Sequence, residues 1–157
     1  MTGFPTVFRA ATEADVEALT DLEQAANEKS LGHLFGGRPF PRDDVAATWR
    51  TRLGEPATVV EVVEEPGGGL AALLCYDAER LQHLAVHPDR WGSGLARAAV
   101  ERAVAAIPGD SVLWCLEDNT RARGLYEHLG WVLSGRTSRS QYPPYLPEVE
   151  YVWRRRG

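Results

Sequence analysis

The chain has 157 residues, 44% of them hydrophobic and 25% charged, which is typical of a single soluble globular domain. Its net charge of −5 argues against a nucleic-acid-binding protein, and no apolar run approaches the roughly 20 residues that a membrane span requires. The first residues lack the basic and apolar regions of a signal peptide, and both cysteines, Cys75 and Cys115, sit inside apolar runs. We therefore expect buried free thiols in a cytoplasmic protein.

Hydrophobic periodicity and turn residues predict the elements along the chain. Thr12 to Asp15 reads as a capping box at the start of a helix, and a Glu-Pro-Gly-Gly-Gly turn joins two apolar strands into a hairpin. The expected elements are a strand at 7–10, helices at 12–27 and 43–53, strands at 58–63, 70–76 and 80–86, a helix at 93–107, a strand at 111–116, a helix at 120–129, and strands at 131–133 and 149–153. This order predicts a mixed sheet with one right-handed crossover.

The segment from residue 86 to 97 carries the strongest chemical signal. A strand ends there, Gly92 and Gly94 follow, and a helix begins. Successive backbone N–H groups at a helix N-terminus bind anions, and glycine lets a phosphate approach the backbone closely. No lysine is present for a P-loop, and Arg97 occupies the third glycine position of a dinucleotide-binding motif. The residues alone thus leave open a phosphate loop of another kind or a tight turn without a ligand.

The basic residues are almost all arginine, and Lys29 is the single lysine among 17. Arginine is the better bidentate phosphate ligand, so this bias could mark an anion-binding surface. The many alanines and the single methionine favour codon bias instead.

Two segments resemble the sequence blocks of the GCN5-related N-acetyltransferase superfamily. The family's phosphate loop reads Q/R-x-x-G-x-G/A, and residues 91–96 read W-G-S-G-L-A. Its second block reads N-x-x-A-x-x-(aromatic or Leu)-Y-E-x-x-G-F, and residues 119–131 read N-T-R-A-R-G-L-Y-E-H-L-G-W. The opening residues 8–15 are also similar, and the order of elements agrees end to end. One departure is Trp91, which stands where the family has Gln or Arg.

The resemblance implies that residues 1–157 form a single α/β (α+β) domain. Its fold would be a mixed, mostly antiparallel sheet with a splayed central strand pair and flanking helices. It also implies acetyl-CoA as the cofactor and an acetyl transfer to a primary amine of a small molecule or peptide. No metal, nucleic-acid or membrane partner is expected, and a homodimer is compatible with the sequence. The implied cofactor contacts are Leu84, Ala85, Val86, Arg90, Trp91, Gly92, Ser93, Gly94, Leu95, Ala96, Arg97, Asn119, Ala122, Arg123 and Tyr126.

The resemblance places Tyr126 at the position of the family's general acid, and an ordinary tyrosine pKa of about 10 suits a thiol leaving group. The general base stays open, because Arg80 replaces the glutamate that histone-modifying relatives have at the start of the third strand. A water chain to bulk solvent is one alternative. The candidate bases are Glu79, His83, Glu117, Asp118 and Glu148.

The acceptor would bind between the loop at 30–41 and the aromatic, proline-rich segment near the C-terminus. The residues that could contact it are His33, Phe35, Tyr142, Tyr145 and Glu148, although each could equally be structural. A different class of function, a non-catalytic acyl-CoA-binding or sensor module of the same fold, also fits the glycine loop.

Overall fold

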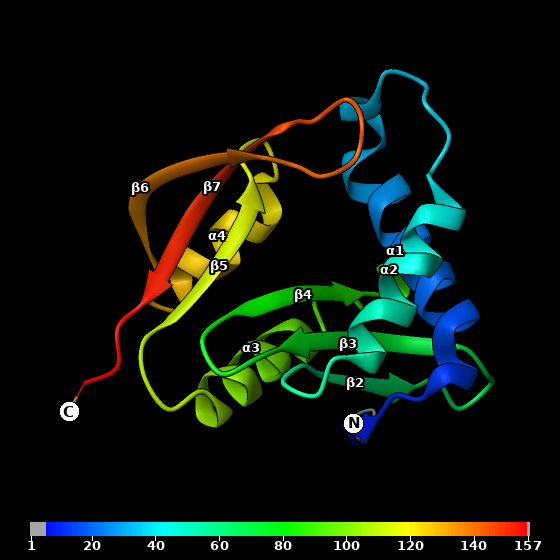
Figure 1. Cartoon of the computed structure of the whole chain (residues 1–157), viewed down its shortest axis with the longest axis horizontal. Helices are drawn as coiled ribbons and strands as arrows, with labels where there is room; N and C mark the ends of the chain where they lie inside the picture. The colour runs from blue at the N-terminus through cyan, green and yellow to red at the C-terminus, as the bar shows by residue number, and fades with distance from the viewer. Residues whose placement is uncertain (1–5, 157) are drawn as a thin grey trace.

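Two antiparallel sheets diverge from a common corner of the molecule (Figure 1). The structure is a computed structural model and describes residues 6–156. The first sheet has the order β1 (Arg9–Ala10), β2 (Val59–Glu64), β3 (Leu70–Tyr76) and β4 (Leu81–Val86). The second has the order β5 (Ser111–Leu116), β7 (Pro147–Trp153) and β6 (Val132–Arg139).

The α-helices are α1 (Val16–Leu31), α2 (Arg42–Gly54), α3 (Leu95–Ala106) and α4 (Thr120–His128). Short 3₁₀ turns lie at Glu13–Asp15, Gly32–Phe35 and Pro88–Arg90. Within residues 6–156, none of the helices has both the length and the apolar character needed to cross a bilayer.

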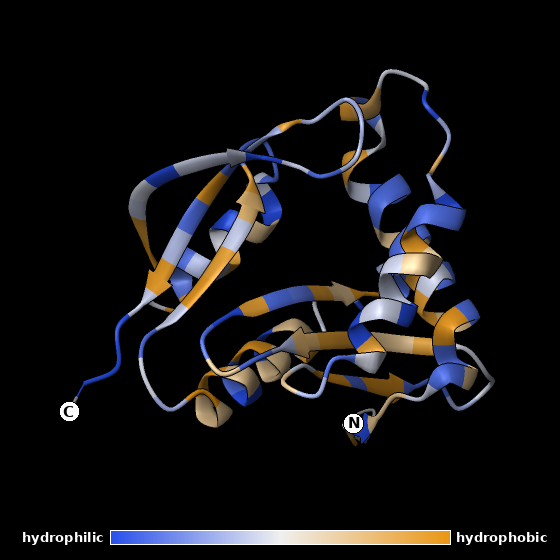
Figure 2. Ribbon diagram, viewed as in Figure 1, coloured by the Kyte–Doolittle hydropathy of each residue, from blue (hydrophilic) through white to orange (hydrophobic). Residues whose placement is uncertain are grey.

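Strand β3 is the centre of the first sheet, and every one of its residues is buried. Alternate side chains along a strand point to opposite faces. Leu73 and Cys75 accordingly pack under α1 and α2, whereas Leu74 packs with α3 on the other face. Burial on both faces explains the continuous apolar run in this strand, which is mostly hydrophobic in Figure 2.

The two sheets meet where β4 and β5 begin. A parallel bridge joins Arg80 to Val112, and the Val112 N–H donates to the Glu79 carbonyl at 3.0 Å. Beyond this bridge, within the described residues, β4 pairs only with β3, and β5 pairs only with β7. The parallel pair therefore opens into a V, which confirms the expected fold with a splayed central strand pair (Figure 1).

Several boundaries differ from the sequence prediction. Strand β6 spans eight residues, far beyond the expected 131–133, and all of its residues are exposed. Its polar sequence has no apolar alternation, so backbone pairing with β7 and not burial defines it. Helix α1 also continues to Leu31, and α3 begins only at Leu95 because its N-cap, Gly94, has a left-handed φ of +87°. Strand β1 is limited to two residues.

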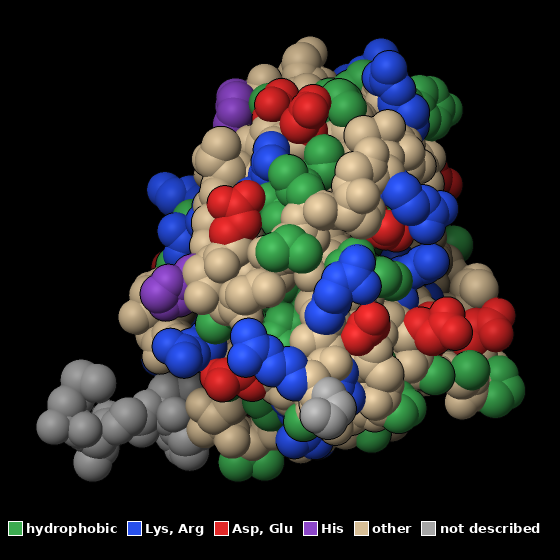
Figure 3. All heavy atoms as spheres, turned by 90° about the vertical axis from the view of Figure 1, so that its left-hand side faces the viewer, with side chains coloured by type: hydrophobic (Ala, Val, Ile, Leu, Met, Phe, Trp, Pro, Cys, Tyr) green, Lys and Arg blue, Asp and Glu red, His purple; other side chains and the backbone are tan. Residues whose placement is uncertain are grey.

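Charged side chains of both signs are interspersed on the side of the molecule where β6 lies (Figure 3). Arg136 of β6, for example, pairs with Glu150 of β7 at 3.4 Å. Arginines on this side therefore lie among acidic neighbours and do not form a continuous basic face.

Candidate functional site

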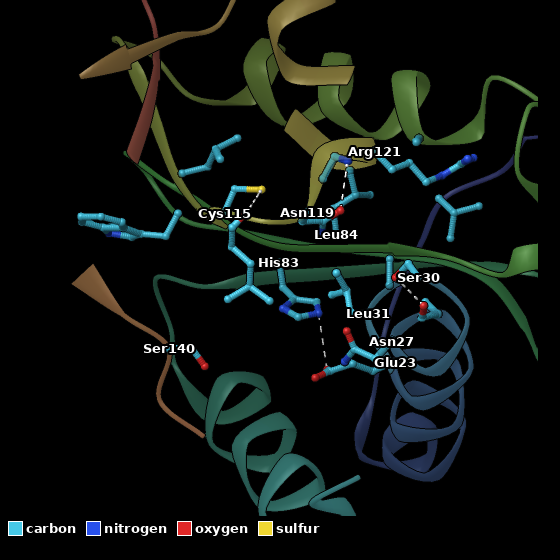
Figure 4. Close-up of a pocket in the computed structure, with 18 of the residues that line it drawn as sticks. Glu23, Asn27, Ser30, Leu31, His83, Leu84, Cys115, Asn119, Arg121 and Ser140 are labelled. Carbon is cyan, nitrogen blue, oxygen red and sulfur yellow. Dashed lines mark hydrogen bonds and ion pairs between the residues drawn. The ribbon is translucent and has the colours of Figure 1, made fainter. Parts of the chain in front are cut away.

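A cleft of about 910 Å³ occupies the V between β4 and β5 (Figure 4). On one face of the V it is bordered by the glycine turn after β4 and by the start of α4; we call this the glycine side. On the other face it is bordered by α1, α2 and the segment between β6 and β7; we call this the helical side. The glycine side and the helical side thus meet in the gap between β4 and β5.

The glycine side is built from a turn that needs glycine. Gly92 and Gly94 have φ values of +81° and +87°, a region that residues with a Cβ rarely adopt. A Cβ built on either residue would meet no atom within 4 Å, so the turn opens onto free space. Within residues 6–156, the backbone N–H groups of Gly92, Gly94, Ala96 and Arg97 donate to no acceptor. Free N–H groups at the start of a helix can bind an anion, and this turn lies at the start of a 12-residue helix.

Trp91, the departure from the family motif, has two contacts at this turn. Its indole N–H donates to the Val86 carbonyl at 2.9 Å, and the guanidinium of Arg121 stacks on its ring at 4.0 Å from the centroid. Arg121 lines the cleft and forms no ion pair with a carboxylate among the described residues. It therefore offers a positive charge beside the glycine turn.

The two arginines that the sequence suggested as phosphate ligands have local carboxylate partners. Arg90 donates to both oxygens of Glu65, at 2.6 and 2.8 Å, and this contact lowers the pKa of Glu65. Arg97 lies on the exposed surface of α3, where it pairs with Glu101 at 3.2 Å. Both residues still border the cleft.

The open edge of β4 supplies backbone donors inside the V. The His87 N–H donates to Ala71 of β3 at 2.8 Å. Because successive N–H groups along a strand point to opposite sides, those of Leu84 and Val86 point away from β3, toward the gap. A ligand in the cleft can therefore pair with β4 as an additional strand would.

Helix α4 brings Asn119, Ala122 and Tyr126 to the cleft. Asn119 is its N-cap and accepts a hydrogen bond from the Ala122 N–H at 3.2 Å, which leaves its amide nitrogen available. Arg123, one turn on, points elsewhere and donates to the Tyr151 hydroxyl and the Glu117 carbonyl, each at 2.9 Å.

Tyr126 is buried against the rings of Trp131 and Tyr151, whose centroids lie 5.9 and 6.1 Å from its own. Burial raises the pKa of its hydroxyl, and the nearby Cys115 thiol adds to this effect. Within residues 6–156 the hydroxyl makes no hydrogen bond, although the residue lines the cleft. Tyr126 therefore presents a protonated, unengaged hydroxyl to the V.

On the helical side, His83 of β4 faces Glu23 of α1 (Figure 4). The His83 Nε2 and the Glu23 Oε1 lie 3.5 Å apart, and the same oxygen accepts the indole N–H of Trp49 at 3.0 Å. Trp49 also packs its ring edge-on to the imidazole at 5.6 Å. Burial lowers the pKa of His83, and the charge of Arg52 adds to this effect while Glu23 opposes it. The imidazole is thus neutral at pH 7 and available to accept a proton.

The segment between β6 and β7 borders the helical side of the cleft and contacts α2. The Tyr142 hydroxyl lies 2.7 Å from the hydroxyl of Thr48 on α2, which ties this segment to the opposite half of the molecule. Glu148 at the start of β7 also lines the cleft, and burial raises its pKa. The second sheet therefore contributes to the same wall as α1 and α2.

The structure brings most of the predicted residues to this cleft and leaves some outside its lining. Phe35, Tyr142, Glu148, His83, Tyr126 and the predicted β4 residues line it. Glu79 lies in the turn before β4, Glu117 and Asp118 follow β5, and Tyr145 is 53% exposed. The predicted residues outside the lining are His33, Glu79, Ser93, Glu117, Asp118, Arg123 and Tyr145.

Sequence reasoning missed Glu23 and Arg121. Glu23 lies four residues after Leu19 and so falls on the apolar face of its helix, and a carboxylate at such a position signals a buried polar contact. Arg121 lay inside the second sequence block at a position that the motif leaves open. Only its stack on Trp91 distinguishes it from the other arginines.

The chain was compared with solved structures, with curated protein sequences and with models of protein families. Among solved structures it is similar to apo YjaB from Escherichia coli (TM-score 0.76, 18% identity, covering 96% of this chain and 98% of that one). It is also similar to the E. coli ribosomal-protein-S18-alanine N-acetyltransferase (TM-score 0.72, 20% identity, covering 96% of this chain and 94% of that one). A mutant of the Vibrio cholerae spermidine N-acetyltransferase SpeG is similar as well (TM-score 0.67, 19% identity, covering 94% of each chain). No curated protein sequence matches the chain significantly. The family model described as an acetyltransferase (GNAT) domain matches residues 55–133.

Proposed function

Because the chain belongs to the GNAT acetyltransferase family, we propose that it transfers an acetyl group from acetyl-CoA to a primary amine of a small molecule or peptide. The observation that carries this proposal is the V between β4 and β5, which has unpaired backbone donors along one edge and a glycine turn with free amides at its end. A thioester with a long amide-containing arm and a pyrophosphate has the groups that these donors require.

The residues of the glycine side fit acetyl-CoA. The four free amides between Gly92 and Arg97 would hold the pyrophosphate, and Arg121 would add the positive charge that Trp91 itself lacks. The N–H groups of Leu84 and Val86 would pair with the amide-containing arm, with the Asn119 amide nearby. A bound acetyl-CoA supplies an activated acyl group, and the Val86 N–H would polarise its carbonyl oxygen.

The two proton transfers would be made by residues on opposite sides of the V. On the helical side, the neutral imidazole of His83 takes a proton from the acceptor amine, which frees the nitrogen lone pair for attack on the acyl carbon. A C–N bond forms and the C–S bond breaks, and on the glycine side the Tyr126 hydroxyl gives its proton to the departing sulfur. The nitrogen still carries a positive charge after the attack, so it loses its second proton, which restores the Tyr126 hydroxyl directly or through water. His83 is preferred to Glu79 and Glu117 as the base because, of these three, it alone lines the cleft.

A coupled assay would test the proposal. Purified protein, acetyl-CoA and a panel of primary amines are incubated, and the released CoA thiol is measured with DTNB. Thermal unfolding with and without acetyl-CoA is measured in parallel. We expect thiol release that depends on an amine, together with stabilisation by acetyl-CoA. Stabilisation without turnover on any amine would instead support a non-catalytic acyl-CoA sensor.

A further inference from the structure

We infer that Glu23 binds the acceptor as a primary alkylammonium ion and presents it to His83. This inference rests on the proposed acetyl transfer and adds the charge class of the acceptor and a residue that selects it. The observation behind it is a carboxylate on the helical side that is almost fully buried, and only one of its two oxygens accepts a hydrogen bond from the described residues.

The two oxygens of Glu23 have different environments. Oε1 receives the Trp49 indole N–H at 3.0 Å and faces His83 Nε2 at 3.5 Å. Oε2 accepts no hydrogen bond from residues 6–156, although only 9% of the side chain is exposed and the residue lines the cleft. A buried carboxylate is costly unless charge-bearing donors satisfy it. The neutral Trp49 indole donates to Oε1 only and Oε2 has no donor among residues 6–156, so the cleft favours a cation there.

The surroundings of Glu23 select an alkyl chain attached to that cation. Asn27 lies one helical turn further along α1 and points into the same part of the cleft (Figure 4). Apolar side chains of Leu31, Phe35 and Phe40 line the cleft on this side. An ammonium group on a flexible aliphatic chain fits both features, because its head is charged and its body is apolar.

The orientation of His83 links binding to chemistry. A neutral imidazole has one ring nitrogen without a proton, so His83 can accept a proton from an ammonium held beside it by Glu23. The other titratable or charged groups near the imidazole are Arg52 of α2 and Cys75, its partner across the β3–β4 ladder. Burial raises the pKa of the Cys75 thiol to about 11, so that thiol is neutral. Glu23 is therefore the negative group beside His83 that stabilises the imidazolium formed when the amine is deprotonated.

The first test is direct binding to the protein saturated with CoA, which requires no turnover. Calorimetric titration compares n-hexylamine with 1-hexanol, a neutral analogue of the same length. We expect the wild type to bind the amine at least about tenfold more tightly, because a charge-assisted contact is stronger than a neutral one. Equal affinity for the two ligands would overturn the inference without using any variant.

The second test is the Glu23→Gln variant, with Glu17→Gln as the matched control. Both variants remove one carboxylate from α1, but Glu17 is 86% exposed and pairs with Arg42 on the surface. Glu23→Gln should weaken amine binding and raise KM about tenfold or more, while the affinity for acetyl-CoA stays unchanged. Glu17→Gln should change neither value. Equal amine affinity in the two variants would overturn the role of Glu23.

The two proposals fail in distinguishable ways. If the wild type binds hexylamine in a Glu23-dependent manner but transfers acetyl to no amine, the acetyl-transfer proposal fails and the ammonium site stands. If transfer occurs with a KM that does not depend on Glu23, the transfer stands and the ammonium site is overturned.

Discussion

Arg121 lies face-on to Trp91 at the glycine turn, with its guanidinium 4.0 Å from the indole centroid. Stacking of this kind fixes the direction of a long side chain without neutralising its charge. The indole is itself held by its hydrogen bond to the Val86 carbonyl. Trp91, at the motif position where the family has Gln or Arg, thus fixes the side chain of Arg121 from helix α4.

We predict that Arg121→Gln weakens the binding of acetyl-CoA by about tenfold to a hundredfold, the usual range for the loss of a charge-assisted hydrogen bond. Calorimetric titration with CoA, 3′-dephospho-CoA and acetyl-pantetheine would measure the effect. Acetyl-pantetheine lacks the phosphates, so its affinity should not change. The control is Arg154→Gln, which removes an exposed arginine that pairs with Asp110 outside the cleft. Equal losses for all three ligands would contradict a phosphate contact.

Gly94→Ala should abolish acetyl-CoA binding and cost about 1–2 kcal/mol of stability, because φ at this position is +87°. Gly68→Ala is the matched control, since Gly68 has a φ of +104° in the β2–β3 turn and does not line the cleft. Both variants should lose comparable free energy of unfolding by chemical denaturation. Only the Gly94 variant should lose thermal stabilisation by acetyl-CoA, and retention of it would contradict the assignment of the glycine turn.

Tyr126→Phe should lower kcat by about a hundredfold or more, as expected for loss of a general acid, and leave the affinity for acetyl-CoA nearly unchanged. The hydroxyl makes no hydrogen bond within residues 6–156, so its removal should change the free energy of unfolding little. Tyr76→Phe serves as the control, because its hydroxyl faces Glu61 outside the cleft. An unchanged kcat in Tyr126→Phe would assign Tyr126 a packing role only.

The rate should fall as the pH decreases through the pKa of His83, which burial places below its usual value of about 6.5. At a pH between the pKa of His83 in the folded chain and its ordinary value in the unfolded chain, the unfolded chain binds a proton that the folded chain does not. The free energy of unfolding therefore also decreases as the pH falls through this interval. Steady-state rates and thermal unfolding between pH 5 and pH 8 would measure both effects, an interval chosen around the ordinary histidine pKa of about 6.5. His83→Gln should remove the acidic limb of both profiles and lower kcat at pH 7. A limb that persists in this variant belongs to another group.

The sequence predicted the elements that hydrophobic patterns define and the backbone side of the site. The glycine turn stood out because a strand end, two glycines and a helix start follow one another, whereas the Asn119 block was recognised through its resemblance to the family's second block. Strand β6 was underestimated because exposed pairing leaves no apolar pattern. Glu23 and Arg121 were missed because their surroundings come from elements distant in sequence, α2 and β4 for the first and the turn after β4 for the second.

The two sides of the cleft should differ in how well they tolerate amino-acid substitutions. The groups that face the gap from Leu84 and Val86 belong to the backbone, and side-chain replacements other than proline leave a backbone N–H in place. The helical side depends on the identity of side chains such as Glu23, His83 and Tyr142. Directed evolution of this scaffold toward new amines should therefore accept changes on α1, α2 and the β6–β7 segment while the acyl donor stays the same.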